Sequence, residues 1–205
     1  MMTVLKPTDN ELLAAMLSGD EEAFAALYRR RQAGIYRFAL QMSGSATLSE
    51  DVTQEVFMIL MGGGGSYDET RGSLSSFLFG VARNLVRQRL GREQSYVSLS
   101  EEDGEGPIGD EFRTNDSPLD ELSRGETIES VRRAVLSLPA RYREVVVLCE
   151  LQEMSYAEAA SVLECAIGTV RSRLHRARAM LSTRMRPAQI ENAVADSVKQ
   201  ARCFA

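Results

Sequence analysis

The chain has 205 residues, 44% of them hydrophobic, and a formal net charge of −5. This length can bury the cores of one or two small domains. The cysteines Cys149, Cys165 and Cys203 form no C-x-x-C pair and His175 is the single histidine, so neither a zinc site nor another metal or cofactor is expected. The start lacks a signal-peptide pattern and no apolar run reaches membrane-spanning length, which predicts a cytoplasmic protein without membrane insertion.

The negative charge is concentrated in one segment. From Glu93 to Glu129, twelve acidic residues stand against two arginines, a local sum of −10, so the rest of the chain carries +5. The part up to Ser117 is poor in apolar residues and rich in Glu, Asp, Gly and Ser, which predicts a flexible acidic linker. The basic remainder is compatible with a polyanionic partner.

Four helices are predicted before the linker from apolar residues at helical spacing. They span residues 10–17, 21–42, 48–61 and 73–91. In the third helix we expect Val52, Val56 and Ile59 to point inward. The opposite side then carries acidic, amide and apolar groups, namely Asp51, Gln54, Glu55 and Met58. This side is either a solvated helix face or a partner-binding face, and the pattern alone does not favour the second.

The fourth helix has a core stripe on one side and a basic side opposite. The stripe consists of Leu74, Phe77, Leu78, Val81 and Leu85, and the opposite side carries Ser76, Gly80, Arg83, Asn84 and Arg87, with Phe79 at its edge. Five arginines and no acid lie between Arg71 and Arg92. Such a surface suits single-stranded DNA, whose bases stack on aromatic rings and whose phosphates meet arginine. Taken alone, the helix more readily suggests that Phe79 packs under a loop.

After the linker, helices are predicted over 118–137 and 139–151, followed by a helix-turn-helix over 155–181. Ser155 and Glu158 have the spacing of a capping box. Tyr156, Ala159, Ala160 and Leu163 form an apolar stripe on the first short helix, and Val170, Leu174, Ala177 and Leu181 form the buried seam of the second. The tail, 186–205, is only weakly amphipathic.

The second helix of this motif is strongly basic. Six arginines and no acid lie between Gly168 and Arg186. At about 100° per residue, the side opposite the seam carries Thr169, Ser172, His175 and Arg176, flanked by Arg171, Arg173 and Arg178. Hydroxyl, imidazole and guanidinium groups can read base edges in a major groove while flanking arginines contact phosphates. The alternative is a solvated cationic face. DNA binding is favoured because the capping box, the short turn and the apolar seam all occur at the positions that a helix-turn-helix requires.

Together these motifs resemble the extracytoplasmic-function sigma factors, the compact promoter-specificity subunits of bacterial RNA polymerase. The resemblance rests on DVTQEVF at 51–57, SLSSFLFGVARNL at 73–85, LPARYREVVVL at 138–148, SYAE at 155–158 and GTVRSRLHRAR at 168–178. It implies an all-α protein with sigma region 2 at 9–91, the acidic linker at 92–117, region 4 at 118–185 and a C-terminal tail at 186–205.

The resemblance also implies a role for each group of residues. Polymerase docking against the β′ clamp helices would use Asp51, Gln54, Glu55 and Phe57, with Phe57 supporting the helix from the side. The β subunit would be a further polymerase partner. Recognition and melting of the −10 element would use Phe77, Phe79, Arg83, Asn84 and Arg87. Recognition of the −35 element would use Thr169, Arg171, Ser172, Arg173, His175, Arg176 and Arg178. The expected partners are core RNA polymerase, promoter DNA and an anti-sigma factor.

Three classes of function are compared. The first is a sigma factor, which catalyses nothing itself. The second is a stand-alone helix-turn-helix regulator that binds an operator without polymerase. The third, a helical scaffold or enzyme, is disfavoured because the sequence has no nucleophile–base pair, metal cluster or phosphate-binding loop. Within the first class, the acidic linker is hypothesised to shield the basic DNA-binding faces of the free protein.

Overall fold

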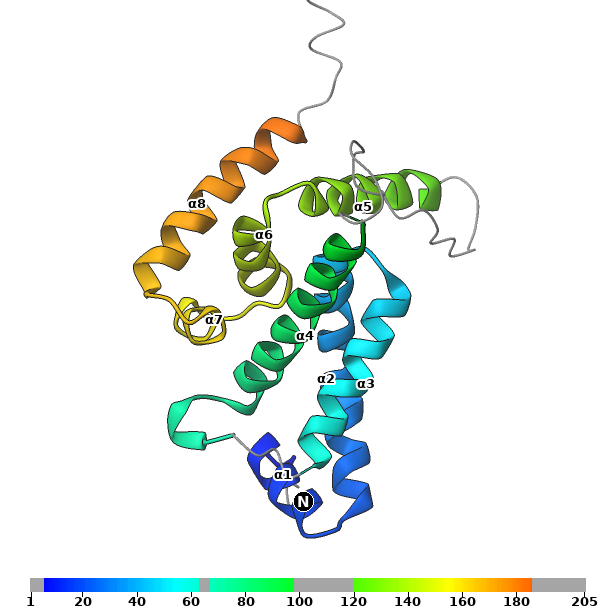
Figure 1. The fold of residues 1–205 in the computed structure, drawn as a ribbon, viewed down its shortest axis with the longest axis vertical. Coiled ribbons are helices and arrows are strands. Elements are labelled where there is room, and N and C mark those ends of the chain that lie inside the picture. The colour runs from blue at the N-terminus through cyan, green and yellow to red at the C-terminus, as the bar shows by residue number, and fades with distance from the viewer. Residues whose placement is uncertain (1–5, 63–66, 98–119, 186–205) are drawn as a thin grey trace, which may run out of the picture.

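The computed structural model describes residues 6–62, 67–97 and 120–185, and every regular element in these ranges is helical (Figure 1). The predicted all-α class is therefore confirmed. Most of the predicted acidic linker and all of the predicted tail lie outside the described residues. The hypothesis that the linker shields the basic faces concerns those residues and stays a prediction. Of the described helices, none is both long and apolar enough to cross a membrane.

The N-terminal half consists of four α-helices and one short 3-10 turn. Their bounds are α1 Asp9–Leu17, α2 Glu21–Ser43, α3 Ala46–Met61, η1 Glu69–Arg71 and α4 Leu74–Val97. Side-chain caps begin the first three: Thr8, Asp20 and Ser45 each accept a hydrogen bond from a backbone amide of the first turn. The α2 helix ends at Gly44, whose φ of 76° lies in the left-handed region that glycine adopts without strain.

Two details of this half differ from the sequence prediction. The α4 helix continues to Val97, six residues beyond the predicted end at Gly91, so the first residues assigned to the linker are helical. Ile59, predicted to point inward, is 40% exposed. Leu60 takes its place in the core and is fully buried, because the buried side of α3 is rotated slightly from the expected stripe.

The C-terminal half also consists of short helices. Their bounds are α5 Asp120–Leu136, α6 Ala140–Val146, η2 Val147–Leu151, α7 Tyr156–Leu163 and α8 Ile167–Arg184. The single helix predicted over 139–151 is instead an α-helix followed by the π-helical turn η2. At its end the Gln152 amide donates to the carbonyl of Val147, five residues earlier, at 3.0 Å. Apolar spacing predicts a helix here but not this change of pitch.

One hydrophobic cluster runs through both halves. It contains Phe38 and Leu78 of the N-terminal half together with Leu138, Leu148 and Leu174 of the C-terminal half, all 2% exposed or less. The α4 helix packs against α2 and α3 of its own half and against α7 of the other (Figure 1). The two halves thus pack directly against each other, with α4 in the middle and α3 and α8 toward opposite sides.

Candidate nucleic-acid and polymerase interface

The helix-turn-helix begins with the predicted capping box. Ser155 Oγ accepts from the Glu158 amide at 3.2 Å, and Glu158 Oε2 accepts from the Ser155 amide at 3.0 Å. The turn follows at Glu164, whose φ of 53° places a non-glycine residue in the left-handed region. Its amide bonds back to α7, and the chain then enters α8. The capping box thus begins α7, and the left-handed residue Glu164 ends it.

The predicted seam of α8 is largely confirmed. Val170, Leu174 and Ala177 are buried, and Leu181 is half-buried at the core's edge. They seat α8 against α6 and α7. The prediction that Tyr156 belongs to the apolar stripe of α7 is wrong: it is 37% exposed, and the Arg171 guanidinium carbon lies 5.8 Å from its ring centroid. A ring at the first helical position has no neighbouring turn to cover it, so it serves as a platform for an arginine instead.

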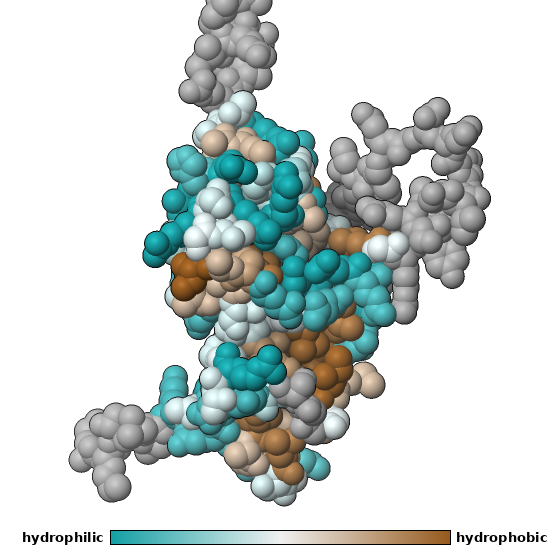
Figure 2. All heavy atoms as spheres, turned by 60° about the vertical axis from the view of Figure 1, so that its left-hand side comes forward, coloured by the Kyte–Doolittle hydropathy of each residue, from teal (hydrophilic) through white to brown (hydrophobic). Residues whose placement is uncertain are grey.

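The outward side of α8 is accessible over most of its length. The exposed predicted −35 residues are Arg171, Ser172, His175, Arg176 and Arg178, while Thr169 and Arg173 are half-buried on its flank. In Figure 2, which turns this side of the molecule forward, the upper part where α8 lies is predominantly hydrophilic. A basic helix that is anchored by one apolar seam and is open on its other side has the shape and charge required to enter a major groove.

Two arginines of α8 already have protein partners. Arg178 forms an ion pair with Glu150 of η2, and hydrogen bonding to that carboxylate raises the pKa of the Arg178 guanidinium. Arg176 hydrogen-bonds the Tyr142 hydroxyl, which lowers the pKa of that tyrosine. Both guanidiniums are therefore oriented before any ligand arrives, and a phosphate would have to replace Glu150 at Arg178.

On α4, the two aromatic residues predicted to shape the −10 surface lie against other rings. Phe77 is half-buried, with its ring centroid 5.5 Å from that of Tyr67. Phe79 is only 7% exposed and packs edge-on against Phe38 with centroids 5.6 Å apart. Its expected place at the edge of the outward face is wrong, because α2 and the C-terminal half enclose that part of α4. The alternative interpretation was that Phe79 packs under a loop; Phe79 is buried, but its ring packs against Phe38 of the α2 helix.

The polar members of the −10 set differ in accessibility. Asn84 and Arg87 are exposed. The Arg83 side chain is 11% exposed, and its Nε donates to Glu144 Oε1 of α6 at 2.8 Å. Glu144 was not anticipated from the sequence as the partner of Arg83: it lies 61 positions from Arg83, and the packing of the two halves brings them together.

The predicted docking face on α3 is exposed in part. Asp51 and Gln54 are exposed, whereas Glu55 is half-buried and pairs with Arg89 Nη2 at 2.6 Å. Phe57 is buried and supports the face from behind, with its ring centroid 4.6 Å from that of Tyr28. Met58, predicted to lie on this side of the helix, is 69% exposed, and two further apolar side chains extend the face, with exposures of 40% for Ile59 and 58% for Met61. Met61 was not part of the predicted face, although its position three residues after Met58 places it on the same side of the helix.

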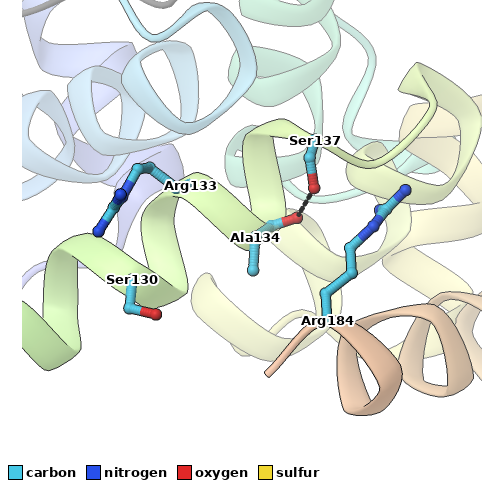
Figure 3. Close-up of a pocket in the computed structure, with 5 residues that line it drawn as sticks. All are labelled: Ser130, Arg133, Ala134, Ser137 and Arg184. Carbon is cyan, nitrogen blue, oxygen red and sulfur yellow. Dashed lines mark hydrogen bonds between the residues drawn. The ribbon is translucent and has the colours of Figure 1, made fainter. Parts of the chain in front are cut away.

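A small open hollow lies between α5 and the end of α8. Its lining residues are Ser130, Arg133, Ala134, Ser137 and Arg184, and the Ser137 hydroxyl donates to the Ala134 carbonyl at 2.8 Å (Figure 3). The hydroxyl is thus engaged in capping the end of α5. Among the described residues, no group of three or more His, Cys, Asp or Glu side chains could hold a metal ion.

Two protein-family models match this sequence, in the order in which they follow along the chain. Residues 27–96 match Sigma-70 region 2, and residues 128–181 match Sigma-70 region 4. The first match contains the α3 face and α4. The second contains the complete helix-turn-helix with the basic face of α8.

Known relatives extend the similarity to most of the chain. The ECF RNA polymerase sigma factor SigM of Mycobacterium tuberculosis H37Rv is 34% identical over 175 residues, covering 85% of this chain and 83% of the relative. SigW of Bacillus subtilis is 30% identical over 176 residues, covering 82% and 91%. The comparisons do not favour a stand-alone regulator.

Two solved structures share the fold. CnrH in complex with the cytosolic domain of CnrY gives a TM-score of 0.62 at 27% identity, covering 85% of this chain and 95% of that one. The sigma factor RpoE of Bartonella quintana, in complex with the anti-sigma factor NepR, also gives 0.62 at 25% identity, covering 75% and 91%. With basic helices, region order and relatives in agreement, the chain belongs to the ECF RNA polymerase sigma factors, which bind RNA polymerase and direct transcription initiation.

Proposed function

We propose that three surfaces of this sigma factor divide the work of initiation. The outward side of α8 reads the −35 element, the basic side of α4 reads and opens the −10 element, and the α3 face docks on the β′ clamp helices of core polymerase. The observation that carries the proposal is the separation of these surfaces on one small helical body: α3 and α8 lie on opposite sides, with α4 between them (Figure 1).

For the −35 element, the proposal divides the α8 residues by their position on the helix. Ser172, His175 and Arg176 lie farthest from the seam and would contact base edges. Arg171 and Arg178 lie on the side of Tyr156 and Glu150 and would hold phosphates. Thr169 and Arg173, half-buried on the other flank, would contact the second strand's backbone.

For the −10 element, Asn84 and Arg87 are the accessible members of the set. Asn84 would line the pocket for an extruded base, and Arg87 would hold a nearby phosphate. Arg83 would add a second phosphate contact once its partner Glu144 is removed. Phe77 and Phe79 would shape the surface on which the strands separate, mainly as a rigid aromatic base beneath it.

For polymerase docking, exposed polar and apolar groups adjoin on α3. Asp51 and Gln54 can form hydrogen bonds and charge pairs, and Met58 and Met61 supply apolar area that water leaves on binding. Phe57 and the pair of Glu55 with Arg89 hold the helix in place. Because its polymerase and promoter are in the bacterial cytoplasm, we propose that the protein works there, and that it has an anti-sigma partner as the Bartonella RpoE does.

The test is reconstitution. The purified protein is combined with core RNA polymerase, and transcripts from fragmented genomic DNA are sequenced. We expect initiation at a defined set of promoters that share −35 and −10 sequences. Transcription no different from that of core enzyme alone would reject the proposal, and tight operator binding without polymerase would instead favour the stand-alone regulator.

A further inference from the structure

The segment formed by α6 and η2 lies against the recognition helix α8, and its two ends reach opposite flanks of that helix. The α6 helix packs against α8 (Figure 1). At the far end of the segment, Glu150 of η2 pairs with Arg178. In the first turn of α6, the Tyr142 hydroxyl meets Arg176. Because a helix turns by about 100° per residue, Arg176 and Arg178 point about 160° apart, so the two contacts lie on different flanks of α8.

The flank at the start of α6 carries two arginines around one tyrosine, the Tyr142 cluster, which consists of Arg141, Tyr142 and Arg176. Tyr142 is 5% exposed, whereas both arginines are exposed. The Arg141 guanidinium carbon lies over the Tyr142 ring, 4.8 Å from its centroid. Hydrogen bonding to Arg176, together with the nearby charge of Arg141, lowers the pKa of Tyr142. One buried side chain therefore contacts two exposed guanidiniums that belong to different helices.

The two flanks of α8 differ in the charge that they offer to a ligand. At Arg178 the protein supplies its own anion, the carboxylate of Glu150. In the Tyr142 cluster the shared group is a hydroxyl, and among the described residues neither Arg141 nor Arg176 forms an ion pair with a carboxylate. Two guanidiniums held close together repel each other, and an anion that binds beside them relieves this repulsion. The arrangement therefore favours an anionic ligand on this flank.

The dimensions of the major groove indicate which anion this is. A groove about 12 Å wide admits one helix about 10–12 Å in diameter, so each flank of the helix faces the phosphate backbone of one strand. In the proposed −35 complex, Arg171 and Arg178 hold one of these backbones. The opposite flank, where Arg173 is half-buried, faces the other backbone, and α6 adds the exposed Arg141 to it. A DNA phosphate therefore fits the Tyr142 cluster by position as well as by charge.

We propose that the start of α6 is a second element of the −35 interface, outside the helix-turn-helix. Arg141 contacts a phosphate of the strand that Arg171 and Arg178 do not hold. Tyr142 is a positioning residue, whose hydroxyl holds the Arg176 guanidinium in the orientation that reads a base pair. The inference rests on the proposed role of α8 in −35 recognition, and it adds to that role two residues that belong to neither helix of the motif.

The first test removes the charge of Arg141. Arg141→Gln is compared with Arg37→Gln, which makes the same charge change at an exposed position of α2. Binding of each holoenzyme to promoter fragments with single-base-pair −35 changes is titrated at several salt concentrations. We expect Arg141→Gln to weaken binding to all fragments by the same factor, and to reduce the steepness of log affinity against log salt by about 0.9. Arg37→Gln, and Arg141→Lys, which keeps the charge, should both retain the parent's salt dependence.

The second test removes the Tyr142 hydroxyl and keeps the buried ring. In the same assay, we expect Tyr142→Phe to reduce discrimination at the base pair read by Arg176 by about two- to tenfold, the range for one hydrogen bond. Discrimination at the other −35 positions should not change. In an Arg176→Ala background the same substitution should have no further effect on discrimination. Tyr156→Phe, which removes a hydroxyl beside Arg178 on the opposite flank, should leave discrimination at that base pair intact.

A lower salt dependence with Arg141→Gln alone, together with reduced discrimination at a single base pair with Tyr142→Phe, supports the second element. The proposal is overturned if Arg141→Gln and Arg37→Gln change the salt dependence equally, or if Tyr142→Phe, shown by circular dichroism to be folded, discriminates at every −35 position as the parent does. Either result leaves the proposed function intact. That function fails separately, and in a different assay, if the parent holoenzyme initiates at no promoter.

Discussion

The two basic helices, α4 and α8, have similar sequence patterns and different surroundings. Both have an apolar seam on one side and arginines on the other. In α8 the arginine side faces outward, although Arg171, Arg176 and Arg178 each meet a side chain of the protein. In α4, Phe79 is buried against Phe38 of α2, and Arg83 pairs with the carboxylate of Glu144 from the other half of the protein.

The difference shows what determines whether a basic helix is available to DNA. The apolar stripe determines which side of a helix packs against the core, and it follows from the spacing of apolar residues along the helix itself. Accessibility of the opposite side depends on what else the chain places there. On α8 that side stays largely exposed among the described residues, whereas on α4 helix α7 packs nearby and Glu144 of α6 pairs with Arg83.

The largest expected effect concerns the seam of α8. Leu174 is 2% exposed and packs in the core beneath the recognition face. We expect Leu174→Ala to lower the free energy of unfolding by about 2–5 kcal/mol, through lost apolar burial and the cavity left behind. Urea unfolding, monitored by circular dichroism, measures this change in the free energy of unfolding. Ser182→Ala, at an exposed position of the same helix, should change the value by less than about 0.5 kcal/mol.

A smaller effect distinguishes base contacts from phosphate contacts on the open helix. Arg176→Ala should relax discrimination at one base pair of the −35 element, at a cost of about 1–3 kcal/mol. Arg178→Ala should instead weaken binding to all −35 sequences by the same factor, and should reduce the salt dependence of binding by the equivalent of about one phosphate contact. Holoenzyme binding to a set of single-base-pair −35 variants at several salt concentrations separates the two. Equal losses on every sequence for both variants would contradict the assignment.

The α3 face extends the comparison to a protein partner. Met58 is 69% exposed, and a charge there would be buried against polymerase without a partner. We expect Met58→Glu to weaken binding to core polymerase by about tenfold, or ~1.4 kcal/mol, without changing protein stability. Fluorescence anisotropy with labelled protein measures the affinity. Ala33→Glu adds the same charge at an exposed position of α2, and an equal loss there would show that Met58 has no special part in docking.

The smallest effect concerns the turn that orients α8. Glu164 has a φ of 53°, a conformation that costs a residue with a side chain about 1–2 kcal/mol and glycine almost nothing. Glu164→Gly should therefore raise the free energy of unfolding by about 1 kcal/mol. Thermal or urea unfolding tests this. Glu164→Ala retains a Cβ and should bring no such gain, so equal stabilisation by both would mean that backbone strain is not the cause.

Local features of the sequence predicted much of this protein. The capping box of Ser155 with Glu158 and the seam through Leu174 depend on residues a few positions apart, and both were predicted correctly. The pairing of Arg83 with Glu144 could not be, because it depends on a contact between the two halves of the protein, 61 positions apart. The exposure of Ile59 and the π-helical turn at η2 are smaller misses, since average helical spacing does not give the rotation or pitch of an individual helix.

The hydrogen bonds of Arg143 bear on the order in which the protein folds during its synthesis. Its guanidinium, whose pKa is lowered by burial, donates to the carbonyls of Leu136 and Leu138 in its own half and to that of Met42, 101 positions earlier. During synthesis on the ribosome, the last turn of α2 therefore emerges long before the side chain that satisfies it. That turn must rely on water until α6 has been translated, so the N-terminal half completes its structure only when the C-terminal half arrives.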